Sequence, residues 1–412
     1  MKTDLKLDIW SSEFKADPFP FYAHLRANSP VHPITLPDKQ TAWLVTRYDD
    51  VAMVLKDERF AKDRMRVYSS EQLAKQPWMP AMFKPLSRNM LDVDPPDHTR
   101  LRALVQQAFS PRTVDQMRPR IESLAHELID RFGRRKRVDL MHDYALPIPT
   151  TIIAEMLGVD ARDRHKFHRW SSGILASTSS SRGTFWALPN VFLFLRYLRR
   201  LIHDRRAEPR DDLVTALVQA HEAGDRLSDD ELISMIFLLI IAGHETTVNL
   251  IASGLLALME HPDQMRRLRD DPSLGRTAVE ELLRFTAPVE TATERIARED
   301  VDVGGTTIPK HGSVLAVIAS ANRDEAHFDN PDTLDIGRDP NKHLAFGLGI
   351  HFCLGASLAR MEGQIAIGTL LERIDELELA VSAGQLRWRP GLVLRGLKAL
   401  PVNVARSAAV VA

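Results

Sequence analysis

The stretch Phe346-Gly-Leu-Gly-Ile-His-Phe-Cys-Leu-Gly355 contains Cys353, the only cysteine among 412 residues. From Leu354 to Leu371 apolar residues recur at intervals of three and four, which predicts a helix that begins beside Cys353. Free N–H groups and the helix dipole at that end stabilise an anionic sulfur. Nearby glycines let the backbone turn sharply and approach a flat ligand: Gly347, Gly349 and Gly355. A lone cysteine is more often a small buried apolar residue, but this setting favours metal ligation.

Four positions of this stretch match a known family pattern. The cysteine-ligand loop of the cytochrome P450 family, the haem-thiolate monooxygenases, reads Phe-x-x-Gly-x-x-x-Cys-x-Gly, and the stretch resembles it at Phe346, Gly349, Cys353 and Gly355. The resemblance implies that Cys353 is the proximal axial ligand of the iron of haem b, iron protoporphyrin IX. It also implies that Phe346, Gly347 and Gly355 adjoin this cofactor.

Composition limits the class of protein. The chain is 44% apolar and 26% charged, which is an ordinary balance for a soluble protein with a large core. Its net charge of −1 argues against a general nucleic-acid partner. One cysteine excludes an intramolecular disulfide and fits a reducing compartment. No linker divides the sequence, so residues 1–412 are predicted to form one domain and, we expect, a monomer.

The sequence also predicts a cytoplasmic protein without a membrane anchor. Met1 to Trp10 alternates charges and lacks an apolar core, so neither a signal peptide nor an anchor is expected there. The longest apolar run, Ile233 to Ala242 with one serine, is about half of what a membrane span requires. This pattern resembles the soluble bacterial type of the family.

A histidine and an arginine one helical turn apart mark a second candidate site. A helix is predicted to begin near Pro96, with Asp97 available as its cap. His98 and Arg102 are four residues apart and therefore share one face. A solvated basic face is the common explanation of such a pair, but the segment resembles the family helix whose His-x-x-x-Arg pair holds the haem propionates. The resemblance implies that role for both residues.

The longest predicted helix has a polar interruption. Ser228-Asp-Asp-Glu231 is a capping-box pattern, and the helix can run to Pro262, about 32 residues or roughly 48 Å. Leu232 to Ala242 is apolar nearly all round, which predicts burial on every side. Gly243-His-Glu-Thr-Thr247 then follows, and burying these polar groups costs several kcal/mol unless they are hydrogen-bonded. A tolerated bend is the structural explanation, and a functional groove at Gly243 is the one that we favour.

This interruption resembles the oxygen-binding motif of the cytochrome P450 family, Ala/Gly-Gly-x-Asp/Glu-Thr. The resemblance implies that Ala242 and Gly243 adjoin the haem. It further implies that Thr246 hydrogen-bonds the bound dioxygen and that Glu245 relays protons from solvent. His244 falls on a variable position of the motif and receives no role.

Five further residues are assigned by family positions. Glu281 and Arg284 match Glu-x-x-Arg, whose expected partner here is Arg338, and the three would form a scaffold for the proximal side. An i,i+3 ion pair is worth only tenths of a kcal/mol when it is exposed, so this signal is weak by itself. Arg295 and His351 fall where the family places cations against the propionates. Surface exposure is the alternative explanation for these two residues.

Four loops are expected to shape the substrate pocket by the same resemblance. Small residues around Ser171 to Gly183 indicate a mobile connection within the second loop, which in the family is a lid over the substrate channel. The loops are apolar enough for a hydrophobic guest such as a macrolide, terpene, steroid or fatty acid, without indicating which. They are Met65 to Leu91, Trp170 to Asn190, Val289 to Thr291, and Leu392 to Leu394.

The sequence therefore predicts a mainly α fold with small β-sheets, including a strand at Trp388 to Gly396, and the resemblance implies the haem-enclosing cytochrome P450 fold. The implied activity is a monooxygenase of secondary metabolism that inserts one oxygen atom of O₂ into a hydrophobic small molecule by hydroxylation or epoxidation. No nucleotide or flavin motif is present, so separate electron donors are implied, a ferredoxin with its reductase or a flavodoxin-type protein. Their candidate contacts are Arg100, Arg102, Arg338 and Lys342. A peroxygenase that uses H₂O₂ and a non-catalytic haem sensor or carrier are the alternatives.

Overall fold

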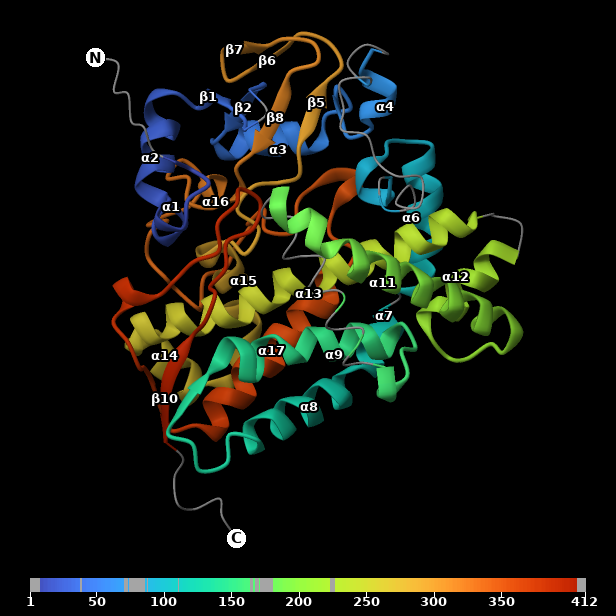
Figure 1. The fold of residues 1–412 in the computed structure, drawn as a ribbon. Helices are drawn as coiled ribbons and strands as arrows, with labels where there is room; N and C mark the ends of the chain where they lie inside the picture. The colour runs from blue at the N-terminus through green and yellow to red at the C-terminus, as the bar shows by residue number, and fades with distance from the viewer. Residues whose placement is uncertain are drawn as a thin grey trace. The chain divides into compact units, whose positions relative to one another are not determined.

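The computed structural model describes residues 8–405 except 38, 70–72, 74–85, 87, 110, 164–165, 167–169, 171–180 and 223–226. The described chain is mainly helical with small sheets, as predicted (Figure 1). It groups into two compact units. Unit 1 comprises residues 1–60, 122–146 and 246–412, and unit 2 comprises residues 61–121 and 147–245. That the 412 residues form one domain stays a prediction.

The largest described sheet joins distant parts of the chain. Its strand order is β1, β2, β8, β5, β3. Strands β2 and β8 run parallel, with Ala42 opposite Ser313, and the β1–β2 and β5–β8 pairs are antiparallel. Buried valine and alanine side chains from β2 and β8 pack with those of helix α3, Tyr48–Lys56, in one apolar core. The strands are Val31–Thr35, Thr41–Val45, Ser313–Ala316, Arg295–Ala297 and Phe60–Ala61.

A three-stranded sheet corrects one expectation from the sequence. Its order is β4, β10, β9, namely Arg137–Asp139, Pro401–Ala405 and Glu376–Leu379. The segment Trp388 to Gly396, which its apolar pattern predicts as a strand, makes only isolated bridges. Pro390 and Gly391, whose φ is +128°, interrupt any regular ladder there. A third sheet pairs β6, Val301–Val303, with β7, Thr306–Ile308.

Close helix packing surrounds α17 in unit 1. This helix, Ala356–Arg373, follows the Cys353 loop and is buried along much of its length. A Cβ on Gly363 would lie 3.0 Å from Leu250 and 3.5 Å from Val279, so glycine permits these helices to approach. The other helices of the unit include α1 Ser12–Ala16, α2 Phe19–Asn28, α14 Pro262–Asp270, α15 Gly275–Thr286 and α16 Ile318–Ala321, with α8 Arg118–Asp130 beginning at its boundary.

Unit 2 contains the helix that carries the predicted propionate pair and part of the predicted lid. Helix α11 begins at Ser181, so the expected connection through Gly183 ends earlier than predicted. Residues 171–180, and the side chains of Phe185 and Trp186, lie outside the described residues, as do residues 74–85 of the first pocket loop. The described helices of this unit include α4 Arg64–Val67, α6 Asp97–Ala108, α7 Pro111–Gln116, α9 Pro147–Met156, α11 Ser181–Ala207 and α12 Leu213–Glu222.

Helix α13, Asp229–Glu260, has the 32 residues that the sequence predicts and contributes to both units. Its capping box forms, because Ser228 N–H donates to Glu231 at 2.7 Å and Glu231 N–H donates to the Ser228 hydroxyl at 3.2 Å. By length and composition α13 could cross a membrane, but 61% of its most apolar window is buried inside the fold. A buried core helix meets the same criteria, as the sequence analysis expects of this one.

Candidate functional site

A tight loop presents the Cys353 thiol. The Cys353 N–H donates to the Phe346 carbonyl at 2.9 Å, closing the loop around a short 3₁₀ turn, Gly349–His351. Gly347 and Gly349 have φ of +69° and +70°, in the left-handed region that glycine enters without strain. The thiol is half-buried and helix α17 begins three residues later, with Gly355 at its N-cap. The helix predicted beside Cys353 is therefore present, slightly further along the chain than expected.

Gly349→Ala is expected to destabilise the protein by about 1–3 kcal/mol. Besides the positive φ, a Cβ at Gly349 would lie 2.8 Å from the Leu55 carbonyl oxygen, which is backbone and cannot move aside cheaply. The midpoint of denaturant unfolding measures the effect. Gly368→Ala on α17 is the matched control, since its Cβ would meet nothing within 4 Å, and a helix interior favours alanine. Equal midpoints for the two variants would contradict this account of the loop.

Three residues that were not predicted from the sequence support the cysteine loop at Phe346. The Arg360 guanidinium lies 4.4 Å from the centre of the Phe346 ring and donates to Glu280 at 2.7 and 2.8 Å. His343 lies 3.0 Å from the same carboxylate. Burial opposes ionisation of Glu280, but the bonds from Arg360 and His343 outweigh it and lower its pKa to about 2. The Phe346 side of the loop is therefore held by helices α15 and α17.

The predicted Glu281, Arg284 and Arg338 contacts are present. Glu281 and Arg284 are fully buried and form two hydrogen bonds of 2.8 Å, and Arg338 lies 3.2 Å from the same carboxylate. Arg284 also donates to the carbonyls of Asn322 and Pro331, each at 2.8 Å. The i,i+3 pair is thus a buried junction rather than the exposed pair that usually explains this spacing. Arg338 is committed to this junction, which argues against its use as a contact for an electron donor.

Between Glu231 and Met259, helix α13 has exposed residues only at its polar interruption. Ala242 and Gly243 are exposed, Glu245 and Thr246 are half-buried, and His244 is buried. The His244 Nδ1 lies 2.6 Å from the Ile240 carbonyl, which can only accept, so Nδ1 carries the proton. The predicted burial on every side therefore fails at Ala242, which is exposed, and is incomplete at Phe237, Leu238 and Ile241, which are half-buried. The helix stays continuous, and the exposure of Ala242 and Gly243 agrees with the expected groove.

A buried carboxyl group lies behind this interruption and was not predicted from the sequence. Glu362 on α17 is 1% exposed and is hydrogen-bonded to the Thr247 side chain. Burial raises the pKa of Glu362 to about 8, against the opposing effect of the Thr247 hydrogen bond. A single acidic residue among the mostly apolar buried positions of α17 was the available signal in the sequence.

Glu362→Gln is expected to remove part of the loss of stability with rising pH. The folded state keeps the Glu362 proton up to about pH 8, whereas the unfolded chain releases it near its ordinary value of 4.5. The stabilisation by this group is therefore complete at low pH and declines between these values, by up to a few kcal/mol. Thermal midpoints of the wild type and the variant across pH 5 to 8 measure it. Parallel curves would contradict the assignment.

The predicted propionate residues are distributed over both units. In unit 2, His98 is 2% exposed, and burial followed by the charge of Arg102 lowers its pKa, which Asp94 opposes. Asp97 does not cap α6 as expected and instead accepts from Arg66 and Arg88 at 3.0 Å each. In unit 1, Arg295 on β5 is buried and His351 is half-buried, so neither is a plain surface cation. Their convergence on one ligand stays a prediction.

The donor set of Cys353 fits a metal carried by a macrocycle better than a metal held by protein alone. Within the described residues no group of three or more His, Cys, Asp or Glu side chains could hold an ion. One half-buried thiol set among glycines suits an iron whose remaining ligands a porphyrin would supply. A Cβ at Gly355 would meet no atom of the described residues within 4 Å, so there is open space at this glycine, two residues after Cys353.

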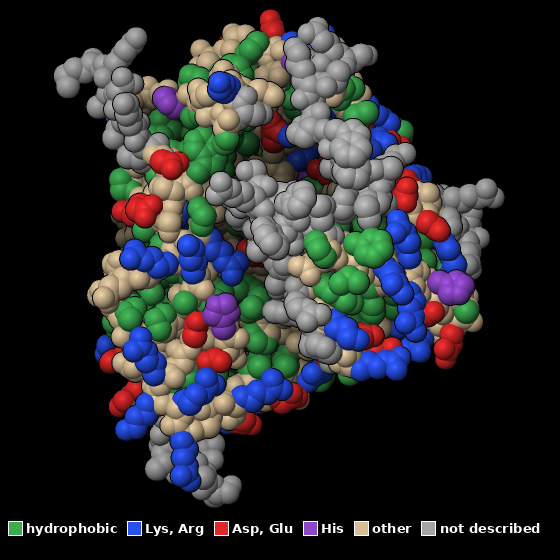
Figure 2. Space-filling model, in the orientation of Figure 1, with side chains coloured by type: hydrophobic (Ala, Val, Ile, Leu, Met, Phe, Trp, Pro, Cys, Tyr) green, Lys and Arg blue, Asp and Glu red, His purple; other side chains and the backbone are tan. Residues whose placement is uncertain are grey.

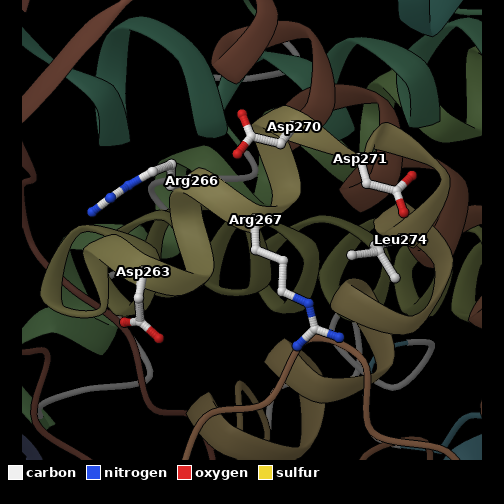
Figure 3. Close-up of a pocket in the computed structure, with 6 residues that line it drawn as sticks. All are labelled: Asp263, Arg266, Arg267, Asp270, Asp271 and Leu274. Carbon is white, nitrogen blue, oxygen red and sulfur yellow. The ribbon is translucent and has the colours of Figure 1, made fainter.

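A surface pocket in unit 1 has a different character. Charged side chains on and just after α14 line it, as Figure 3 shows, and Arg267 donates to Asp335 at 3.0 Å. None of the predicted site residues contributes to it. A charged, open lining of this kind does not suit a hydrophobic guest. Its lining residues are Asp263, Arg266, Arg267, Asp270, Asp271 and Leu274.

Known proteins match nearly the whole chain. Residues 34–379 match the family profile named Cytochrome P450. The chain is 43% identical over 399 residues to the polyketide biosynthesis cytochrome P450 PksS of Bacillus subtilis, covering 96% of this chain and 97% of that one. It is 44% identical over 405 residues to the cytochrome P450 monooxygenase PikC of Streptomyces venezuelae, covering 98% and 94%. The crystal structure of the myxobacterial cytochrome P450 CYP267B1 in complex with myristic acid aligns with a TM-score of 0.90 and 44% identity, covering 97% and 99%.

The chain belongs to the cytochrome P450 family. It is an oxidoreductase that incorporates oxygen, of the bacterial monooxygenase and hydroxylase type found in secondary metabolism, and haem iron is characteristic of this family. The predicted family, fold class and enzyme class are confirmed.

Proposed function

We propose that the protein is a haem-thiolate monooxygenase that hydroxylates or epoxidises a hydrophobic small molecule with electrons from separate redox proteins. The observation that carries this proposal is the accessible Cys353 thiol in a glycine-rich loop closed by the Cys353 N–H bond to Phe346. The complex of the relative CYP267B1 with myristic acid and the naming of PksS for polyketide biosynthesis agree with an apolar substrate.

Haem b is the cofactor that these residues would hold. Cys353 would bind its iron, with Phe346, Gly347, Gly355, Ala242 and Gly243 beside the ring. His98, Arg102, Arg295 and His351 would neutralise its propionates. When bound, this group supplies the activation of O₂ that amino-acid side chains cannot provide. The Cys353 thiolate would hold the iron and supply electron density to it.

Two residues of α13 would handle protons. Glu245 is half-buried, so its carboxylate can exchange protons with solvent on one side and remain part of the helix on the other. Thr246 follows directly, and its hydroxyl can accept one hydrogen bond while it donates another. Ala242 and Gly243, about one turn earlier on α13, are exposed and carry only a methyl group and a hydrogen. Glu245 would supply the proton, and the Thr246 Oγ1 would hold it for transfer.

The source of oxidant tests the proposed function. The purified holoprotein, supplied with O₂, a nicotinamide cofactor, ferredoxin and ferredoxin reductase, is expected to oxygenate some members of a library of hydrophobic compounds. Efficient product formation with H₂O₂ and none with any ferredoxin or flavodoxin system would establish a peroxygenase instead. Binding of O₂ or carbon monoxide with no product from either oxidant would establish a sensor or carrier.

Thr246→Ala is expected to uncouple reductant use from product formation. Without the hydroxyl, electrons continue to be consumed but are released as peroxide or water, so product per reductant should fall by roughly tenfold or more. Product, reductant and peroxide are measured in the same reaction. Thr247→Val is the matched control, because its hydroxyl is engaged with Glu362 and it should stay coupled. Tight coupling in Thr246→Ala would count against the relay.

A further inference from the structure

Unit 1 contains a fully buried cluster of ionisable side chains that the proposed chemistry does not use. Lys15 on α1 and Glu290 are both 0% exposed and form an ion pair of 2.6 Å. The Tyr22 hydroxyl on α2 donates to the other oxygen of Glu290 at 2.5 Å. Burying such groups is costly, and a well-packed apolar trio of similar size would often be as stable. The cluster therefore needs a reason other than stability.

The cluster holds two loops that are distant in sequence. Glu290 lies in the segment 289–291, and the Lys15 ammonium also donates to the Leu392 carbonyl at 3.3 Å. The two loops pair through their backbones, because Glu290 N–H donates to the Val393 carbonyl at 2.8 Å and Val289 forms an antiparallel bridge with Leu394. Lys15 thus contacts both loops at the point where they meet.

A second connection ties the same loops to α1. Arg395 is buried and donates to the carbonyls of Lys15 and Ala16, each at 3.0 Å, and to that of Thr286 at 3.2 Å. Its own N–H donates to the Pro288 carbonyl at 3.1 Å. Arg395 therefore connects the last residues of α1 to the segment that precedes Val289.

The loop surfaces away from the cluster are apolar and partly exposed. The Glu290 side chain is fully buried against Lys15, whereas Val289, which forms the bridge to Leu394, is half-buried. Thr291 Oγ1 is buried and makes no hydrogen bond within the described residues. Val393 is 38% exposed, and Val289, Leu392 and Leu394 are half-buried. These are the two loops that the sequence analysis assigns to the substrate pocket.

We propose that Lys15, Glu290 and Tyr22 are positioning residues that set the spacing of the two pocket loops and thereby the substrate selectivity of the enzyme, without touching the substrate. This inference rests on the proposed function, in which the two loops line the substrate pocket. It places a determinant of selectivity in the N-terminal helices, behind the surface that meets the guest. A displacement of about 1 Å at a binding surface can change reaction rates by roughly a hundredfold. The three residues Lys15, Glu290 and Tyr22, which we call the clamp, are therefore expected to have a measurable effect.

Three holoenzyme variants and one control test the clamp. Lys15→Met removes one charge and keeps the apolar stem, Tyr22→Phe removes one hydrogen bond, and Lys15→Met with Glu290→Gln removes both charges. Arg205→Met is the matched control, because the Arg205–Asp212 ion pair in unit 2 is similarly buried, at 3% and 4% exposure, and Arg205 also donates to the Gly158 carbonyl of the same unit. If Lys15→Met does not fold, Tyr22→Phe decides the outcome.

Amide hydrogen exchange gives a readout that does not depend on activity. Exchange at Glu290 and Arg395 is expected to accelerate by about tenfold in Lys15→Met and by less in Tyr22→Phe, with partial restoration in the double variant. Arg205→Met should leave both amides unchanged. Unchanged exchange at these amides in every clamp variant would overturn the proposal.

Selectivity is measured as the ratios of dissociation constants for a panel of hydrophobic ligands, followed by the optical shift of the haem. We expect at least one ratio to change by roughly tenfold in the clamp variants and none in Arg205→Met. If the clamp variants, like the control, lose thermal stability but keep the ratios of dissociation constants unchanged, the clamp has a merely structural role. A wild type without the thiolate signature would refute the proposed function instead, and amide exchange alone would then decide whether the clamp exists.

Discussion

Cys353→Ser is expected to abolish the red-shifted Soret band that the reduced, carbon monoxide-bound protein gives through thiolate ligation. A serine hydroxyl is nearly the same size as the thiol but stays protonated at neutral pH, so the anionic ligand is lost while the loop can keep its shape. The backbone bond from residue 353 to the Phe346 carbonyl does not depend on the side chain. Oxygenation should fall to background for the same reason.

The measurement is a difference spectrum of the reduced protein with and without carbon monoxide, normalised to haem content. Phe352→Leu is the control for disturbance of the loop, because Phe352 is adjacent and 39% exposed. It should keep the band. An unchanged band in Cys353→Ser would remove the central assignment and, with it, the proposed roles of the residues around the cofactor.

Glu281→Gln is expected to cost about 3–5 kcal/mol of stability. The Glu281 carboxylate is fully buried and accepts from Arg284, from the Asp335 N–H at 3.0 Å and from Asn341 at 3.0 Å, besides its contact with Arg338. Neutralising it leaves the Arg284 guanidinium, also fully buried, without its counter-charge. The glutamine NH₂ group is itself a donor, and it would face the donors that now bond to the Glu281 carboxylate.

Denaturant unfolding of the haem-loaded protein measures this effect, with haem retention followed in the same samples. Asp204→Asn is the matched control, since it breaks an i,i+4 pair of 3.6 Å with Arg200 that is 51% and 78% exposed and should cost less than about 1 kcal/mol. Because Glu281 and Arg284 connect α15 to the segment before the cysteine loop, haem should be lost at a lower denaturant concentration. A Glu281→Gln variant as stable as the control would show that the junction is not needed.

The candidate contacts for an electron donor differ in availability. Arg100 is paired with Glu231, and Arg338 belongs to the Glu281 junction. Lys342 is exposed and Arg102 is half-buried. Figure 2 shows that Lys and Arg side chains are scattered over one face of the molecule, interspersed with Asp and Glu. Net charge by itself therefore gives no docking site, in keeping with the formal charge of −1.

Local signals in the sequence were sufficient for the elements that carry the site. The capping box at Ser228 and the proline at 262 predicted the two ends of α13, and the structure has them. The spacing of Glu281 and Arg284 predicted a pair on one helix, and the structure pairs them. Caps, helical period and short motifs act over a few residues, so they can be recognised without knowledge of the fold.

Contacts between distant residues were not recognisable in this way. Lys15 and Glu290 are separated by 275 positions, and neither has a neighbour in sequence that indicates burial. Glu362 reads as one more acidic residue on a helix until Thr247 is found beside it. At Trp388 to Gly396 the apolar pattern predicted a strand, but Pro390 and Gly391 interrupt the ladder and only isolated bridges to Val289 and Leu397 form. Side-chain period says which residues can pair but not which ones do.

By itself the sequence determined the family, the helical fold and the identity of a single possible thiolate ligand, because these depend on residue types at fixed local spacing. Tertiary structure alone decided which charges are buried and what faces them. It turned the Glu281 pair from an ordinary helix contact into a buried junction, and it brought α1 against two loops near the other end of the chain. The physical reason is that the energy of a charge depends on the dielectric environment and the partners that surround it, and folding supplies both.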